Sequence, residues 1–249
     1  FIVHFLLYPA SNGYNSYFDK DEKSIGGLKN PPPVNQGLYW LSLLFDCLAI
    51  ILGWIYVSVQ FSMMAFIYGL VSKAYSHPSI RIKKYPILSW LIAGFFQGFF
   101  TFIMCYTGIN DFSLEIAWKP NVLYAATLTS VMLWANYPMT QVYQHEEDGK
   151  RGDKTLSILL GIKGTFYFVA IVFTFSTLGF LLFFIHYFSW FYAIAFLLFL
   201  SPVLAYFMVW FIKVLRDERK ADYQHTMWLN VISATCLNAF FIFLFLHST

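Results

Sequence analysis

Apolar residues along this chain gather into long blocks, and short polar connections separate the blocks. Several blocks approach about 20 residues without period-two alternation, which suits helices that cross a hydrocarbon core of roughly 30 Å. Segments that span lipid must satisfy their own backbone hydrogen bonds, so they are helices or closed barrels. The pattern predicts membrane-spanning helices at 1–17, 38–54, 57–74, 86–107, 120–142, 165–186, 188–212 and 226–247.

The composition supports this interpretation. Of 249 residues, 59% are hydrophobic and only 12% are charged, and a soluble domain of this size would need more charge to cover its surface. We therefore expect one all-α domain over 1–249, a polytopic membrane bundle of about eight helices. The break between the second and third helices rests on Gly53, Ser58 and Gln60. The chain begins at Phe1 inside an apolar block, so we expect its natural N-terminus to be missing.

The basic residues test the number of spans. Eight spans in alternating directions put the connections 18–37, 75–85, 143–164 and 213–225 on one side of the membrane. Of the 16 Lys and Arg residues, all except Lys119 lie on or beside those connections. An error of one helix would destroy this asymmetry, and the positive-inside rule makes that side cytoplasmic.

A first acidic cluster follows the opening helix, in the stretch "NSYFDKDE". If the helix continues, Asn15 and Asp19 stand at i and i+4 on one face, and Glu22 at i+7 extends the row. An amide and two carboxylates are suitable oxygen ligands for Mg²⁺, which often binds substrate phosphates as well. A solvated helix end is the alternative.

A second cluster lies in "YQHEEDGKRGDKTLSILLG" on the same side of the membrane. Gln144 and Asp148 stand at i and i+4, Glu147 is adjacent, and Asp153 follows Gly152. Carboxylates at a helix C-terminus oppose the helix dipole, which is unfavourable without nearby cations. Two such helix ends on one face predict two halves of a single metal and diphosphate site, with two unrelated solvated loops as the alternative.

These stretches, together with "KAYSHPSIRIKKYP" between them, resemble the UbiA superfamily of intramembrane prenyltransferases. That family has Asn-x-x-x-Asp-x-x-x-Asp in one cytoplasmic loop and Asp-x-x-x-Asp in a second. The resemblance covers the whole chain in motif order and spacing. The family usually has nine helices, which implies that the first helix is the missing part. The resemblance also implies a location in a bacterial-type inner membrane, with the site facing the cytoplasm.

The resemblance implies specific roles for residues of this chain. Catalysis would rest on Asn15, Asp19, Lys83 and Asp148. Two departures from the family pattern stand out: Lys23 occupies the third acidic position of the first motif, so that Asp21 or Glu22 must replace it, and Gln144 occupies the first Asp of the second. The expected metal ligands are Asn15, Asp19, Glu22, Gln144, Asp148 and Asp153. The expected diphosphate-binding residues are Tyr75, Arg81, Lys83, Lys84, Lys150 and Arg151.

The implied function is transfer of a prenyl group. With Mg²⁺ as cofactor, the protein would ionise a polyprenyl diphosphate and alkylate a lipophilic, aromatic acceptor of the quinone-biosynthesis type. Membrane lipid is the other expected partner. The sequence has no basic stripe with interleaved aromatic residues, so nucleic acid is not expected as a partner. A UbiA-like terpene cyclase, a catalytically impaired diphosphate-binding relative and a membrane transporter are the alternatives. The acceptor, the prenyl chain length and the oligomeric state remain open.

Other polar and aromatic residues have more than one interpretation. Asp46 lies inside a span, where ionisable groups are costly and often functional, but we favour a structural polar contact. His145 adjoins the second motif as a candidate proton acceptor or a solvated loop histidine. The phenylalanines of 95–102 can line a groove for the prenyl tail or simply pack in the bundle. The single cysteines Cys47, Cys105 and Cys236 indicate neither a zinc site nor disulfides.

Overall fold

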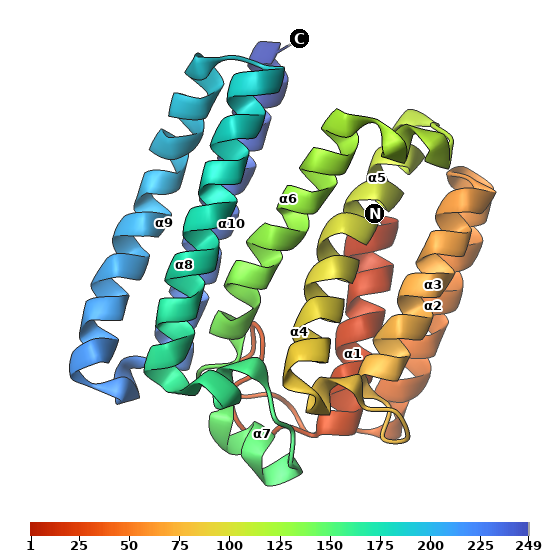
Figure 1. The fold of residues 1–249 in the computed structure, drawn as a ribbon. Helices are drawn as coiled ribbons and strands as arrows, with labels where there is room; N and C mark the ends of the chain where they lie inside the picture. Colours follow the sequence, from red (N-terminus) through yellow and green to blue (C-terminus); the bar gives the residue numbers. More distant parts are fainter. Residues whose placement is uncertain (249) are drawn as a thin grey trace.

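The computed structural model describes residues 1–248 and forms a bundle of long helices (Figure 1). Within this part of the chain there is no strand, only an isolated bridge between Ile25 and Leu28. The prediction of an all-α bundle is confirmed. The elements are η1 Ile2–Leu7, α1 Tyr8–Asp19, α2 Gln36–Tyr56, α3 Val59–Ser76, η2 Ile82–Lys84, α4 Pro86–Gly94, η3 Phe95–Phe100, α5 Thr101–Asn110, η4 Leu114–Trp118, α6 Pro120–Asn136, η5 Tyr137–Thr140, α7 His145–Arg151, α8 Leu156–Tyr187, α9 Trp190–Arg216, η6 Glu218–Lys220 and α10 Tyr223–Ser248.

Each of the predicted apolar blocks is helical. Among the described residues, five helical segments are long and apolar enough to cross a membrane, as judged by length and composition. They are α2, the continuous segment α4–η3–α5, α8, α9 and α10. The first, third and fifth predicted blocks correspond to η1–α1, α3 and α6, which are shorter or more polar. The chain is therefore an integral membrane protein built as a helical bundle.

Two helix boundaries show how local sequence sets the chain direction. Between α2 and α3, the Ser58 hydroxyl accepts a hydrogen bond from the Phe61 backbone N–H at 3.0 Å and caps α3. The sixth predicted span, 165–186, lies within α8, which consists of two helical stretches joined at a kink. The kink is at Gly161, whose φ of 70° and ψ of 168° are non-helical and open essentially to glycine alone, so a short helical segment from Leu156 precedes the predicted span.

The segment η3 is a π-helical turn in the middle of a membrane-spanning helix, at Phe95–Phe100. The Ser130 hydroxyl of α6 accepts from the Phe99 backbone N–H at 2.8 Å and donates to the Gly94 carbonyl at 2.9 Å. Gly98 lies so close to α6 that an added Cβ would be 2.5 Å from the Ser130 Cα. The π-helical turn is thus held in place by α6, and such turns are frequent at functional sites.

Two hydrophobic clusters stabilise the bundle, and α6 belongs to both. One cluster combines α6 with α8, α9 and α10 around large side chains such as Phe184, Phe196 and Trp210. The other combines α6 with η1, α2, α3 and α5, and includes Phe61 and Met104. In Figure 1, α6 lies between these two groups of helices. The protein therefore has two packed halves that meet along α6.

An ion pair connects three helices from the N-terminal part of the chain. The Asp46 carboxylate on α2 contacts the Lys73 ammonium on α3, and both side chains are largely buried. The Lys73 ammonium also lies 4.9 Å from the centre of the Tyr14 ring on α1. Asp46 thus has the structural polar contact that we favoured for it, because the pair fixes α1, α2 and α3 relative to one another.

Candidate functional site

The two acidic motifs lie at the same end of the bundle and line one cavity of about 380 Å³. We call this cavity the outer chamber. It is formed where the end of α1 and the connection after it meet α7, which Figure 1 shows at the lower end of the molecule. Residues far apart in sequence converge here, which supports the predicted shared site. Its polar lining includes Asn15, Asp19, Asp21, Lys83, Asp148 and Arg151.

The first motif is shaped by the end of α1. Asn15 donates to Asp19 at 2.9 Å along one helix face, as the i and i+4 spacing predicts, and Ser76 donates to the Asn15 side-chain oxygen at 2.7 Å. The helix ends at Asp19 because Lys20 adopts a left-handed conformation with φ 51°. The chain therefore turns, Asp21 lines the outer chamber, and the predicted helical row does not extend to Glu22, which is exposed.

The second motif has a different local structure from the predicted one. α6 ends at Asn136, and a separate short helix, α7, begins after Gln144, its N-terminal flanking residue. Asp148 lies in the first turn of α7 with two glutamates, where carboxylates interact favourably with the helix dipole. The expectation that these acids oppose the dipole at a helix C-terminus is therefore wrong. Gly152, with φ 74°, ends α7 and turns the chain so that Asp153 lines the chamber.

Cations of the connection between α3 and α4 bind carboxylates of both motifs. Arg81 donates to the two Asp153 oxygens from Nε and from one terminal nitrogen, each at 2.8 Å, in a bidentate pair. A terminal nitrogen of Arg81 is also 3.5 Å from Asp19 Oδ1. The Lys83 ammonium contacts Asp19 and is 3.5 Å from Asp153 Oδ2. These two side chains electrostatically link motifs that are distant in sequence.

Arg151 completes the network from the other side. It donates to Asp148 Oδ1 at 2.6 Å, lies 3.3 Å from Asp153 Oδ2 and contacts Asp21, which is 130 positions earlier in the chain. Burial raises the pKa of Asp148 to about 6, although Arg151 opposes the shift. For Asp153, burial acts in the same upward direction, but the hydrogen bond from Arg81 and the nearby cations lower its pKa overall.

The charge balance of the outer chamber leaves capacity for a further cation. Four carboxylates, those of Asp19, Asp21, Asp148 and Asp153, face three cationic side chains. The second oxygen of Asp148, Oδ2, is buried and has no hydrogen-bond partner among the described residues. Within residues 1–248, no three Asp, Glu, His or Cys side chains are already arranged around one point as a metal cluster. The oxygen donors are those that a hard divalent cation takes, so a metal would bind by displacing Arg and Lys partners.

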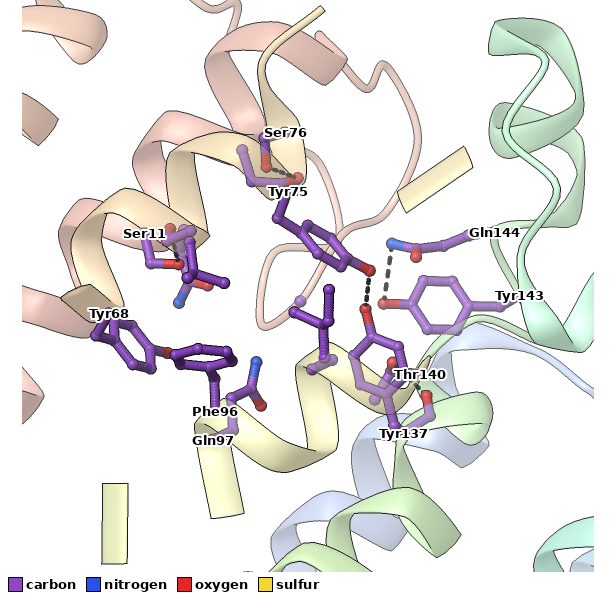
Figure 2. A pocket seen from close by; sticks show the side chains of 17 residues that line it. Ser11, Tyr68, Tyr75, Ser76, Phe96, Gln97, Tyr137, Thr140, Tyr143 and Gln144 are labelled. Carbon is purple, nitrogen blue, oxygen red and sulfur yellow. Dashed lines mark hydrogen bonds between the residues drawn. The ribbon is translucent and has the colours of Figure 1, made fainter. Parts of the chain in front are cut away.

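A second cavity of about 270 Å³ adjoins the outer chamber, and we call it the inner chamber (Figure 2). The two share lining residues, among them Tyr75, Tyr137 and Gln144. Figure 2 shows the hydroxyl groups of Tyr75 and Tyr137 hydrogen bonded to each other, and Gln144 pointing at Tyr143. The Gln144 amide donates a long hydrogen bond of 3.5 Å to the Tyr143 hydroxyl. The tyrosine cluster thus marks the junction of the two chambers.

Three of the predicted site residues lie away from both chambers. Glu22, Lys84 and Lys150 are exposed, and none lines either cavity. The Lys84 ammonium lies 5.0 Å from the centre of the Tyr85 ring, whereas Lys150 pairs with Glu146 and Glu147 at 3.1 Å and 3.2 Å. Their geometry favours a role as solvated surface charges. The other predicted ligands and clamps all line the outer chamber or bind a side chain that does.

Several lining residues had not been singled out from the sequence. Tyr137, Thr140 and Gln141 come from the segment around η5, directly before the second motif, and Tyr143 lines the inner chamber. The signal was present in "NYPMTQVYQ", where polar and tyrosine side chains cluster at the end of an apolar span. Of the phenylalanines considered for a tail groove, Phe96 lines the inner chamber, and Phe99, Phe100 and Phe102 pack against the hydrophobic cluster that includes Phe61 and Met104.

His145 is not a freely solvated loop histidine. Its Nε2 is hydrogen bonded to the Ser157 hydroxyl at 2.7 Å, and burial lowers its pKa. It is the first residue of α7 and lines neither chamber. The structure therefore favours a role for His145 in joining α7 to the start of α8.

The fold and the site define the class of the protein: it is a helical integral membrane protein with a charged cavity at one end of the bundle and a neutral cavity beside it. A sequence model of the UbiA prenyltransferase family matches residues 1–232, and the chain belongs to this family. Comparisons with curated proteins and with solved structures found no match. Members of the family are membrane prenyltransferases, for which a prenyl diphosphate and a lipophilic acceptor are the substrates.

Proposed function

We propose that this protein uses Mg²⁺ to ionise a polyprenyl diphosphate in the outer chamber and transfers the prenyl group to a lipophilic, aromatic acceptor of the quinone-biosynthesis type. One observation carries the proposal: Asp19 and Asp148, from motifs far apart in sequence, line the same cavity. The basic residues around this end of the bundle support a cytoplasmic orientation of the outer chamber. The membrane that we propose is a bacterial-type inner membrane.

The residues of the outer chamber divide into two roles. Asn15, Asp19 and Asp148 would hold the metal, with Gln144, Asp153 and Asp21 close by. When bound, Mg²⁺ neutralises the diphosphate and makes it a better leaving group. Arg81, Lys83 and Arg151 would exchange their carboxylate partners for diphosphate oxygens, a task that suits the planar guanidinium fork and the mobile ammonium group.

The reaction follows from this placement. The bond between the allylic carbon and the diphosphate oxygen breaks, and its electron pair leaves with the diphosphate. Aromatic faces attract cations, and Tyr75, Tyr137 and Phe96 lie where the allylic cation would form, at the junction of the chambers or inside the inner one. The electron-rich acceptor ring then attacks the cation, a carbon–carbon bond forms, and the ring proton passes to the released diphosphate.

The test is an assay of membranes that contain the full-length protein. They are incubated with labelled geranyl, farnesyl, geranylgeranyl and longer diphosphates, with and without Mg²⁺, and with a panel of acceptors. We expect Mg²⁺-dependent diphosphate release together with a prenylated acceptor. A cyclic product without acceptor would indicate a terpene cyclase. Absence of Mg²⁺-dependent release with every diphosphate would reject the enzyme and leave the impaired relative or the transporter.

Gln144 allows a sharper test of the metal site, because the family pattern has Asp at this position. Gln144→Asp adds a carboxylate to the wall shared by both chambers, so it should lower the Mg²⁺ concentration for half-maximal diphosphate release by on the order of tenfold. Gln224→Asp is the matched control, since Gln224 is exposed on α10 outside both chambers. An unchanged Mg²⁺ requirement in Gln144→Asp would show that this position does not contribute to metal binding.

A further inference from the structure

The inner chamber differs in charge from the outer chamber that it adjoins. In the part of the chain that the structure describes, no Asp, Glu, Lys, Arg or His lines the inner chamber. Its polar lining consists of hydroxyl and amide groups, such as those of Ser11, Asn12, Tyr137 and Gln97. At about 270 Å³, it lies near the lower end of the roughly 300–1,000 Å³ range of small-molecule pockets. The chamber therefore suits the head group of a small molecule that is polar and uncharged.

Gln97 is the most unusual member of this lining. It lies in the π-helical turn η3, roughly 16 Å along the helix from Pro86 by helical rise, and so deep within a membrane-spanning segment. The Ser130 hydroxyl holds the turn in place, and Figure 2 shows Gln97 beside Phe96 at the cavity. Its side chain makes no hydrogen bond to any other described residue, and the same is true of Asn12 on α1.

A hydrocarbon tail would be a poor occupant for these amides. Both residues are exposed, so their amides are accessible at the cavity, and a prenyl chain seated there would bury them without offering a donor or an acceptor, which is unfavourable. A ring bearing hydroxyl or carbonyl groups offers both. A carboxylate would find no cation in the lining of the inner chamber: Lys83 and Arg151 line only the outer chamber, where Lys83 binds Asp19 and Arg151 binds Asp148.

We propose that the inner chamber binds the head group of the acceptor, that this acceptor is an uncharged phenol or quinol and not a ring carboxylate, and that Gln97 and Asn12 determine this specificity. The inference rests on the proposed prenyl transfer and narrows its substrate class. Both amides can donate and accept, so they match a hydroxyl group and equally a carbonyl group. Burial of an anion there is unfavourable, because it would have no ion-pair partner.

The first experiment compares two acceptors that differ in one carboxylate: hydroquinone and gentisate, its ring-carboxylated derivative. Membranes with the full chain receive Mg²⁺, the prenyl diphosphate that gives the fastest release, and one of the two acceptors. We expect kcat/KM for hydroquinone to exceed that for gentisate by about a hundredfold. Equal use of the two, or a preference for gentisate, would overturn the proposal.

The second experiment changes the specificity residue itself. Gln97→Leu should raise KM for hydroquinone about tenfold and leave unchanged both KM for the prenyl diphosphate and its acceptor-free release. Gln97→Asn, which keeps a shorter amide, should recover part of the loss. Gln97→Lys, which adds a cation, should improve the use of gentisate. Gln36→Leu at the start of α2 is the control, because Gln36 is exposed and lies outside both chambers.

Binding measurements separate failure of this inference from failure of the proposed function. Purified protein in detergent is tested by equilibrium dialysis with hydroquinone and gentisate, which requires no turnover. Tighter binding of hydroquinone than of gentisate, weakened in Gln97→Leu, supports the inference whether or not the protein releases diphosphate. Absence of diphosphate release in the same preparation would reject only the proposed enzyme activity. Normal diphosphate release with an unchanged KM for hydroquinone in a folded Gln97→Leu variant would reject the inference alone.

Discussion

Asp19→Asn and Asp148→Asn are each expected to slow Mg²⁺-dependent diphosphate release by about a hundredfold to a thousandfold, the range typical of a lost electrostatic contact to a reacting group. Both carboxylates line the outer chamber, and one oxygen of Asp148 is buried without a partner. The amide keeps the shape of the side chain but removes the charge that binds a divalent cation. Release from a labelled prenyl diphosphate measures the effect directly.

The control for this pair is Asp217→Asn. Asp217 follows α9 on the same side of the bundle, pairs with Arg219 and lies outside the chambers, so the rate should stay within about twofold of wild type. The double variant Asp19→Asn/Asp148→Asn should be little slower than either single variant, because residues that act as one unit are not additive. Wild-type release by both single variants would mean that the outer chamber does not carry the reaction.

Lys73→Met is expected to lower the free energy of unfolding by roughly 3–5 kcal/mol, because it leaves the buried Asp46 carboxylate without its cation. The pair joins α2 to α3 within the apolar part of the bundle, and Lys73 also contacts the Tyr14 ring of α1. Replacement of both partners, as in Lys73→Met/Asp46→Leu, removes both charges together and should restore most of the lost stability. Denaturant or thermal unfolding in detergent measures these differences.

The matched substitution is Lys213→Met in the last turn of α9, where the lysine is exposed and a change within about 0.5 kcal/mol is expected. Folded Lys73→Met protein should keep a near-normal rate of diphosphate release per molecule, because Lys73 lines neither chamber. A stable Lys73→Met variant, or a double variant as unstable as the single one, would contradict the structural role of the pair.

The sequence predicted the spans well because the apolar blocks are long and the connections carry nearly all the basic residues. Its errors came from backbone details that hydropathy does not report. The short helical segment before Gly161 was not predicted, because hydropathy does not report the non-helical backbone at this glycine, which kinks α8. The π-helical turn η3 depends on Ser130, which lies in another helix. The sequence of residues 95–100 alone does not predict this π-helical turn.

The candidate site, like the fold, was predictable from the sequence only in part. The Asn15 and Asp19 pair follows from i and i+4 spacing and was predictable. The choice between Asp21 and Glu22 was not, because it depends on the left-handed turn at Lys20. For the second motif a signal was present but unused: Pro138 lacks a backbone N–H and favours a break just after α6, so α7 begins anew and places its acids in a first turn.

The position of α6 between the two packed halves matters for the order in which the parts of the protein are synthesised. Every described residue that lines either chamber precedes Leu156, so the ribosome has synthesised the complete lining before α8 begins. Yet Met139 and Val142, just before α7, are buried in the cluster that α8, α9 and α10 complete. A nascent chain released at that point would possess all the chemistry of the chambers without the support that holds its second motif in position. The last three helices, α8, α9 and α10, are thus synthesised after the chamber-lining residues that they help to hold in position.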